Sequence, residues 1–141
     1  MELLKILKDV EILSVNGQVD IDIEDISYDS RKVKQNSMFL CIRGNTVDGH
    51  NYIDDAIQKG AIAILIDKKI SYKKGITYIR VNNVKEVMAI IGKNFFQNPC
   101  QKINLIGVTG TNGKTSTVSF IKQILGYDCK VGSIGTIEIY D

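Results

Sequence analysis

The sequence predicts an α/β protein, because segments with strand and helix patterns alternate along most of its 141 residues. Residues 61–66 form a continuous apolar run of strand length, and a helix pattern over 52–59 precedes them and closes at Gly60. A glycine-rich stretch, 107–117, lies between an apolar segment and another helix pattern. That order is typical of a phosphate-binding loop.

The other elements of the first hundred residues follow from the spacing of the apolar side chains. Helical spacing marks the N-terminus, and strict alternation marks the first strand. In chain order we expect a helix over residues 1–7, strands over 19–23 and 37–42, a turn-rich segment over 43–50, a strand over 77–81 and a helix over 84–96.

The single proline, Pro99, lies in the polar stretch 97–102. Proline ends a helix and biases the preceding residue away from helical geometry. We therefore predict a boundary between an N-terminal domain, 1–98, and a second part, 99–141. For the second part we expect a strand over residues 103–108, the glycine loop over 109–113 and a helix over 114–125. A strand over 130–134 then continues into a final apolar segment, 135–139.

The composition is that of an ordinary globular protein, with 44% hydrophobic and 24% charged residues. No apolar run approaches the roughly 18–20 residues of a membrane span, and the N-terminus lacks the layout of a signal peptide, so we expect a cytoplasmic protein without a membrane partner. The lysines of 67–74 lack interleaved aromatics and predict a solvated face, not a nucleic-acid site. Cys41, Cys100 and Cys129 lie far apart and are expected to be reduced thiols.

The glycine loop departs from the usual pattern GxxxxGK[ST], whose first glycine would fall at Val108. It retains Gly110 and Gly113, followed by Lys114 and Thr115. Residues without Cβ let backbone N–H groups turn toward phosphate oxygens, and the next helix adds its dipole. We expect Lys114 to neutralise phosphate charge and Thr115 to ligate Mg²⁺. The alternative is a plain glycine turn with an exposed lysine.

The string TGTNGKT at 109–115 resembles the ATP loop of the Mur ligases, which form amide bonds with ATP in peptidoglycan synthesis. Folylpolyglutamate synthases carry a similar loop, typically with glycine at the position of Thr115. The resemblance implies ATP and Mg²⁺ as cofactors and Lys114 as a catalytic residue. It implies an ATP site formed by Gly110, Thr111, Asn112, Gly113, Lys114, Thr115 and Ser116.

Three N-terminal stretches resemble the uridine-nucleotide-binding domain shared by two Mur ligases: YDSRKV at 28–33, MFL at 38–40 and RGNTVDGHNYI at 43–53. Gln35-Asn36 stands where the family commonly has Pro-Gly, and asparagine also tolerates a turn. The resemblance implies a UDP-binding domain with a mixed sheet flanked by helices. The first β-loop-α-β unit of a P-loop ATPase domain would follow it.

Asp29, Ser30 and Arg31 follow a short strand and place a carboxylate, a hydroxyl and a guanidinium at one turn. This set suits a uracil edge or a diphosphate. The residues alone favour another interpretation, a local turn closed by their own side chains. The resemblance instead implies that Ser30 contacts a UDP-sugar.

By the same resemblance Thr46, Val47 and Asp48 are further candidates for the UDP-sugar site. His50 is the single histidine, and no cysteine or carboxylate set accompanies it at metal-ligand spacing. We expect a structural or ligand-edge role for His50 in preference to a metal-binding one.

The two similar ligases add either the third peptide residue or D-alanyl-D-alanine. Thr111 and the stretch SIGTIE at 133–138 resemble the enzyme that adds the third residue. Its expected substrates are UDP-N-acetylmuramoyl-L-alanyl-D-glutamate, which ATP activates as an acyl phosphate, and L-lysine or meso-diaminopimelate. The alternatives are the D-alanyl-D-alanine-adding ligase and a module that binds a UDP-sugar or ATP without chemistry. A P-loop kinase or GTPase is disfavoured, because it would leave the N-terminal motifs unexplained.

Only about two dozen residues follow the glycine loop. We therefore expect the start of an ATPase domain whose remainder is missing, and a chain without ligase activity of its own. A lone βαβ unit of about 40 residues buries little apolar surface and exposes strand edges. We hypothesise that its strands dock on the N-terminal domain or pair with a second copy, which would give self-association.

Overall fold

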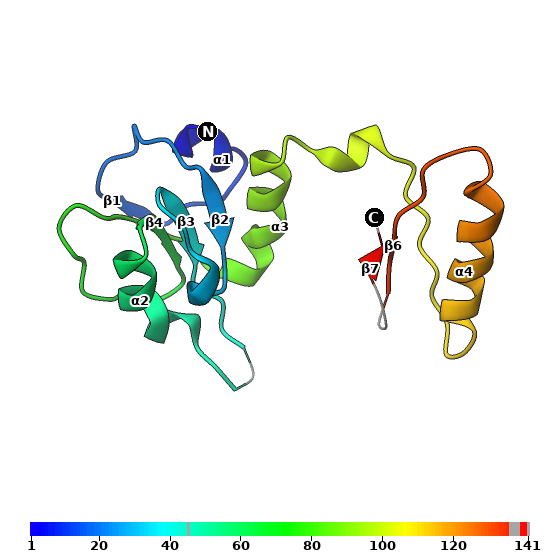
Figure 1. Cartoon of the computed structure of the whole chain (residues 1–141). Coiled ribbons are helices and arrows are strands. Elements are labelled where there is room, and N and C mark those ends of the chain that lie inside the picture. Colours follow the sequence, from blue (N-terminus) through cyan, green and yellow to red (C-terminus); the bar gives the residue numbers. More distant parts are fainter. Residues whose placement is uncertain (45, 136–138, 141) are drawn as a thin grey trace. The chain divides into compact units, whose positions relative to one another are not determined.

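The computed structural model describes residues 1–44, 46–135 and 139–140, and its contacts divide the chain into two compact units (Figure 1). Unit 1 is Met1–Lys102 and unit 2 is Ile103–Asp141. The helices of unit 1 are α1 (Leu3–Ile6), α2 (Ile53–Gln58) and α3 (Val84–Phe95), with 3₁₀ turns η1 (Ser30–Lys32), η2 (Gly49–Tyr52) and η3 (Pro99–Lys102). Its strands are β1 (Ser14–Asn16), β2 (Asp25–Ser27), β3 (Ser37–Leu40), β4 (Ala61–Ile66) and β5 (Thr77–Arg80).

The five strands of unit 1 form one mixed sheet in the order β1-β5-β4-β3-β2. Strands β2, β3, β4 and β5 are parallel, while β1 pairs antiparallel with β5 at the edge. The expected α/β fold with a mixed sheet flanked by helices is thereby confirmed. The carboxyl ends of the four parallel strands lie at one edge of this sheet.

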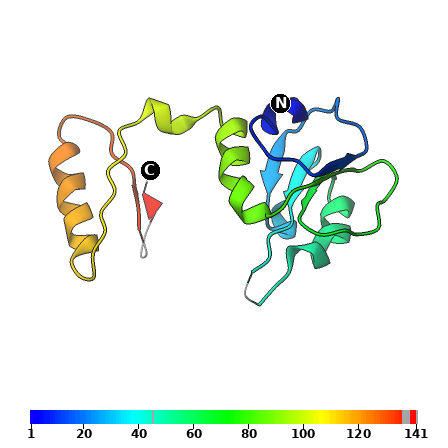
Figure 2. The ribbon, with the colours of Figure 1, turned by 180° about the vertical axis from the view of Figure 1, so that it is seen from behind.

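Side chains on both faces of the sheet are buried, as is usual for parallel strands covered by helices. On one face, Met38, Leu40 and Leu65 pack with the apolar side chains of α1 and α3. On the other, Phe39 and Ile64 pack with those of α2. Figures 1 and 2 show the helices around the sheet from opposite sides. Because both faces are covered, β4 has the continuous apolar sequence from which it was predicted.

The turn after α2 requires glycine. Gly60 has φ +109°, and a Cβ built there would lie 2.7 Å from the Cα of Gln35. Residues with a side chain rarely adopt this backbone conformation, and no space exists for one here. The predicted end of the helix at Gly60 is therefore confirmed.

One N-terminal expectation was wrong, and one strand was missed. Residues 19–23 form no strand; Asp22 makes one isolated bridge with Glu2, and the Ile23 N–H donates to the Met1 carbonyl oxygen at 2.8 Å. The alternating apolar side chains of residues 19–23 pack against the N-terminal segment. The pattern therefore reflects burial of one side of the segment, without the hydrogen-bond ladder of a strand. Strand β1 was not predicted, because all three of its residues are exposed and carry no pattern.

Unit 2 contains α4 (Lys114–Leu125), β6 (Ser133–Ile134) and β7 (Ile139–Tyr140). Helix α4 has the predicted bounds, but the expected strand over 103–108 is not formed: residues 104–110 have no regular structure. An apolar run becomes a strand only where a neighbour supplies its hydrogen bonds. Strands β6 and β7 pair antiparallel, so the parallel βαβ arrangement is absent from the described residues. Residues 136–138 of the expected final segment, including part of SIGTIE, lie outside them.

Candidate functional site

The carboxyl edge of the parallel strands gathers most of the predicted N-terminal residues. Ser30 follows β2, the loop 41–48 follows β3, and Asp67 follows β4. In open sheets of parallel strands, ligands bind outside this edge. The fold therefore brings together three segments that are distant in the sequence.

The Asp29 turn is held by its own side chains. The Asp29 carboxylate accepts from the Arg31 N–H at 3.0 Å and from the Arg31 guanidinium at 2.9 and 2.8 Å. The hydrogen bond from the Arg31 side chain lowers the pKa of Asp29 to about 2. The local turn inferred from the residues alone is thus present, and it fixes the backbone on which Ser30 sits.

Ser30 is 6% exposed and lies beside α2. Its hydroxyl, followed by the Lys59 ammonium, lowers the pKa of the Asp55 carboxyl. Lys59 Nζ also donates to the Ser30 carbonyl oxygen at 3.2 Å. The Ser30 backbone is therefore tied to α2 through Lys59, and its hydroxyl lies near Asp55 at the strand edge.

The loop after β3 presents Thr46 and Val47 to solvent, whereas Asp48 is half-buried. The Gly44 N–H donates to the Val47 carbonyl oxygen at 2.8 Å, which closes the loop on itself. The Asp48 carboxylate accepts from the His50 N–H and caps η2. Of the three predicted residues, Thr46 and Val47 are open to a ligand and Asp48 is engaged with protein groups.

His50 is buried between two carboxyl-bearing residues. Its Nδ1 lies 2.6 Å from Asp48 Oδ1, and its Nε2 accepts from the Asp67 N–H at 3.4 Å. Lys68 Nζ donates to Asp48 Oδ2 at 2.6 Å. The Lys68 hydrogen bond lowers the pKa of the Asp48 carboxyl, and the two hydrogen bonds from His50 lower it further.

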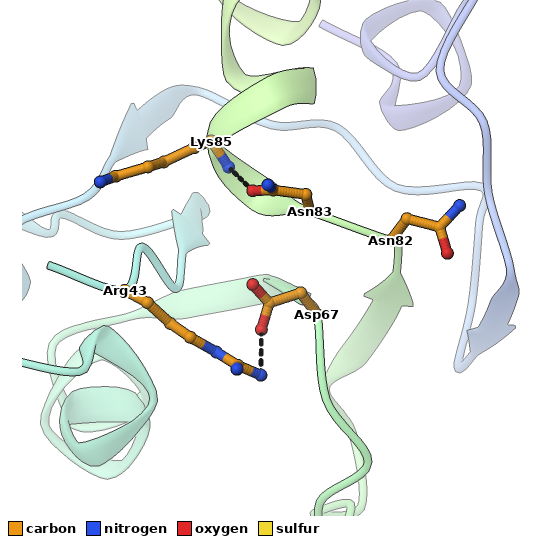
Figure 3. A pocket seen from close by; sticks show the side chains of 5 residues that line it. All are labelled: Arg43, Asp67, Asn82, Asn83 and Lys85. Carbon is orange, nitrogen blue, oxygen red and sulfur yellow. Dashed lines mark hydrogen bonds and ion pairs between the residues drawn. The ribbon is translucent and has the colours of Figure 1, made fainter.

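A pocket of about 290 Å³ lies where β4 and β5 end (Figure 3). Its walls are Arg43, Asp67, Asn82, Asn83 and Lys85. Arg43 and Asp67 point toward one another, and Arg43 Nη2 lies 2.7 Å from Asp67 Oδ1. These residues were not predicted as site residues. Arg43, Asp67 and Asn82 come directly after predicted strands, and this position could have identified them.

The predicted ATP loop leads into α4. Gly113 is the N-cap with φ +74°, a left-handed conformation that favours glycine, and no side chain caps the helix. The first N–H groups of α4 are therefore left for another acceptor, which is the property that makes a helix start a phosphate site. The predicted residues 110–116 are all exposed.

Lys114 folds back onto the loop. Its Nζ donates to the carbonyl oxygen of Gly110 at 2.6 Å and to that of Thr111 at 3.4 Å. The ammonium thus lies over the loop backbone, close to the uncapped start of α4. Thr115, the predicted Mg²⁺ ligand, is in the first turn of that helix.

None of the described helices is long and apolar enough to cross a membrane. Within ranges 1–44, 46–135 and 139–140, no group of three or more His, Cys, Asp or Glu side chains could hold a metal ion. Burial raises the pKa of the Cys41 thiol, which lies in the core of unit 1.

Comparison with known proteins gives one consistent result. A model described as "Mur ligase family, catalytic domain" matches residues 22–96, and one described as "Mur ligase middle domain" matches residues 108–141. The UDP-N-acetylmuramoyl-L-alanyl-D-glutamate--2,6-diaminopimelate ligase of Alkaliphilus metalliredigens is 49% identical over 138 residues, 97% of this chain and 28% of that protein. The protein of the same name from Clostridioides difficile is 46% identical over 142 residues, 100% of this chain and 29% of that protein.

A solved structure of a ligase of this name superposes with a TM-score of 0.69 at 19% identity, over 99% of this chain and 28% of that one. At this identity the likeness concerns the fold. The chain spans less than a third of the length of each of these relatives.

Proposed function

The chain belongs to the Mur ligase family, and from this premise we propose that it takes part in ATP-dependent addition of the third amino acid to UDP-N-acetylmuramoyl-L-alanyl-D-glutamate. The observation that carries the proposal is the 49% identity to a ligase of that name, which extends over 97% of the chain. It covers both the strand edge and the ATP loop. The names of the two relatives favour 2,6-diaminopimelate as the incoming amino acid.

In this proposal residues 1–98 are the UDP-sugar-binding domain. Ser30, Thr46 and Val47 contact the UDP-sugar at the carboxyl edge of the parallel strands, and Asp48 belongs to the same loop. The buried hydroxyl of Ser30 and the exposed side chains of the loop support this assignment. The arrangement suits a nucleotide, because a ligand at this edge meets backbone and side-chain groups from several strand ends.

Residues 99–141 contribute the ATP loop. The uncapped N–H groups at the start of α4 fit phosphate oxygens, and the Lys114 ammonium fits the charge of the outer phosphates. Thr115, in the first turn of α4, would hold Mg²⁺, and Gly110, Thr111, Asn112, Gly113 and Ser116 would surround the phosphates. Bound Mg²⁺ would supply charge neutralisation for phosphoryl transfer to the D-glutamate carboxylate. We place the reaction in the cytoplasm, where ATP and UDP-sugars are found.

We further propose that the 141 residues by themselves form no amide. Incubation of the pure chain with ATP, Mg²⁺, UDP-N-acetylmuramoyl-L-alanyl-D-glutamate and 2,6-diaminopimelate should give no tripeptide product. Product at a rate proportional to chain concentration would overturn this part of the proposal.

Binding of the UDP-sugar tests the N-terminal site directly. At about 100 times its Kd, UDP-N-acetylmuramoyl-L-alanyl-D-glutamate should stabilise the chain by about 2.7 kcal/mol in thermal unfolding. Ser30→Ala should weaken binding about tenfold, because it removes a buried hydrogen-bonding group. Ser14→Ala, on the exposed edge strand β1, is the matched control and should keep the full shift.

The ligand-induced shift must be compared within each variant, since Ser30→Ala alters the contact with α2 even without ligand. No shift in the wild-type chain, or an equal shift in Ser30→Ala, would contradict the proposed site.

A further inference from the structure

The loop of Thr46 and Val47 is tied down by a group of side chains to which the proposed function gives no task. The group consists of Lys68, Asp48 and His50, together with the backbone of Asp67. It joins the end of the loop after β3 to the end of β4. We refer to it as the His50 bridge.

The hydrogen bonds of His50 indicate which ring nitrogen carries the proton when the ring is neutral. The Asp67 N–H donates to Nε2 at 3.4 Å, whereas Asp67 Oδ1, 3.5 Å from Nε2, has no hydrogen-bond partner among the described residues, so Nε2 is assigned as an acceptor. The proton of a neutral imidazole is then on Nδ1, which donates to Asp48 Oδ1 at 2.6 Å. The His50 side chain is only 2% exposed, so its ring nitrogens are shielded from water. His50 thus accepts from one strand end and donates to the other.

Both carboxylate oxygens of Asp48 accept from protein donors. Oδ1 accepts from the His50 N–H at 3.0 Å as well as from Nδ1, and Oδ2 accepts from Lys68 at 2.6 Å. A negatively charged carboxylate near the diphosphate of a ligand would repel it unless it were neutralised. In this position Asp48 serves as an anchor and leaves ligand contact to its neighbours.

The anchor acts on a short closed loop. Arg43 and Asp48 form an isolated antiparallel bridge, and the Gly49 N–H donates to the Ile42 carbonyl oxygen at 2.9 Å. The loop between them carries Thr46 and Val47. A shift of Asp48 therefore moves the base of the loop as a whole.

We propose that His50 is a positioning residue for UDP-sugar binding: through its Nδ1–H bond to Asp48 it holds the loop of Thr46 and Val47 in the orientation that accepts the ligand. This rests on the proposed function, in which that loop contacts the UDP-sugar. The affinity for the UDP-sugar should therefore depend on the hydrogen-bond donor at the Nδ1 position and much less on the acceptor at the Nε2 position.

Two amide substitutions separate the two nitrogens. In His50→Asn the amide nitrogen takes the place of Nδ1 and can still donate to Asp48. In His50→Gln the amide oxygen takes the place of Nε2 and can still accept from Asp67, but the donor to Asp48 is lost. Both replace the buried ring and both should lower the thermal stability, so stability alone does not distinguish them.

Calorimetric titration of the full chain with UDP-N-acetylmuramoyl-L-alanyl-D-glutamate measures the affinity of each variant. We expect His50→Gln to bind about tenfold more weakly than His50→Asn, because a hydrogen bond to a charged carboxylate is lost. Equal affinities of the two variants would overturn the role. A wild-type chain that binds no ligand would overturn the proposed function and the role with it, and the wild-type titration identifies that case.

The lysine end of the bridge provides a second, charge-matched test. Lys68→Met removes the donor to Asp48 Oδ2, whereas Lys73→Met removes a donor 2.6 Å from Asp54 in the same connecting segment. The charge change is identical. We expect weaker UDP-sugar binding for Lys68→Met than for Lys73→Met, and equal binding would contradict an anchoring role of Asp48.

The single histidine gives a spectroscopic signature that packing alone does not produce. In a chain labelled with ¹⁵N-histidine, all imidazole signals come from His50. We expect the neutral ring to carry its proton on Nδ1, with Nε2 unprotonated. The opposite tautomer would overturn the donor role.

Discussion

Helices α3 and α4 each have 12 residues, but they differ in what holds them. The Asn83 side chain caps α3, and Val84 and Ile91 are fully buried against the sheet of unit 1. Helix α4 begins at an uncapped glycine and buries none of its side chains. Its apolar residues Phe120 and Ile124 are 64% and 68% exposed. Helices α3 and α4 thus have equal length and similar amphipathic sequences but opposite degrees of burial.

The difference shows what each helix start can do. The Asn83 oxygen accepts from the Lys85 N–H at 3.0 Å, so the first turn of α3 has a protein partner. The first turn of α4 has no such side chain and leaves its N–H groups to a phosphate. Glycine at the N-cap in place of asparagine lowers helix stability by about a few tenths of a kcal/mol. The binding property of α4 is therefore obtained at the expense of local stability.

The largest expected difference between the units is in amide hydrogen exchange. Amides of β4 and α3 should exchange only on global unfolding of unit 1, whereas a 12-residue helix without packing is marginal in water. We expect exchange in α4 to be at least about a thousandfold faster than in β4. The measurement is exchange followed by mass spectrometry or NMR on the ligand-free chain.

The same experiment tests the hypothesis that unit 2 docks or self-associates. Slow exchange in α4 at high chain concentration that becomes fast on dilution would support pairing with a second copy. Slow exchange independent of concentration would contradict the exposed state of α4 described above.

The fold was predictable where the apolar pattern and the final burial agree. Helix α2, helix α3 and strands β3, β4 and β5 all followed from patterns that the sheet of unit 1 makes use of. Residues 103–108 have an equally strong strand pattern, but no neighbouring strand pairs with them. Local sequence specifies what a segment can become, and a strand additionally needs a partner.

The site was predictable only in part, for a similar reason. Ser30 and the loop of Thr46 were found because they belong to contiguous motifs. The bridge from His50 to Lys68 joins residues that are separated along the chain, and nothing in their spacing indicates that β3 and β4 end side by side. Contacts between strand ends follow from the order of strands in the sheet, which the sequence pattern did not specify.

A pair of identical substitutions measures the difference in packing between the units. Ile64→Ala in β4 removes a fully buried side chain and should lower the free energy of unfolding of unit 1 by about 2–5 kcal/mol. Ile124→Ala in α4 removes a side chain that is 68% exposed and should change stability by no more than about 0.5 kcal/mol. Urea unfolding followed by circular dichroism provides both values. Comparable losses would show that Ile124 is packed in solution.

The smallest expected effect is the response of unit 1 to acid, since the groups involved are close to solvent. Hydrogen bonds lower the pKa values of Asp29, Asp48 and Asp55, all in unit 1, and that of Asp29 to about 2. An unfolded aspartate has a pKa of about 3.9, so the unfolded chain takes up protons before the folded chain does. The stabilising contribution is complete above about pH 4 and is lost as the pH falls through about 2.

The urea midpoint of unit 1 should therefore decrease between about pH 4 and about pH 2. Asp29→Asn should make this decrease shallower, because the variant lacks the Asp29 carboxylate that takes up a proton in this range. Arg31 is then without this charged acceptor at every pH. Asp54→Asn is the charge-matched control, since Asp54 is 69% exposed and pairs with Lys73 on the surface. If the two variants respond to acid alike, the Asp29 turn contributes no more than any surface charge. A shallower response of Asp29→Asn alone would show that the acid sensitivity of unit 1 comes in part from the turn that holds Ser30 at the strand edge.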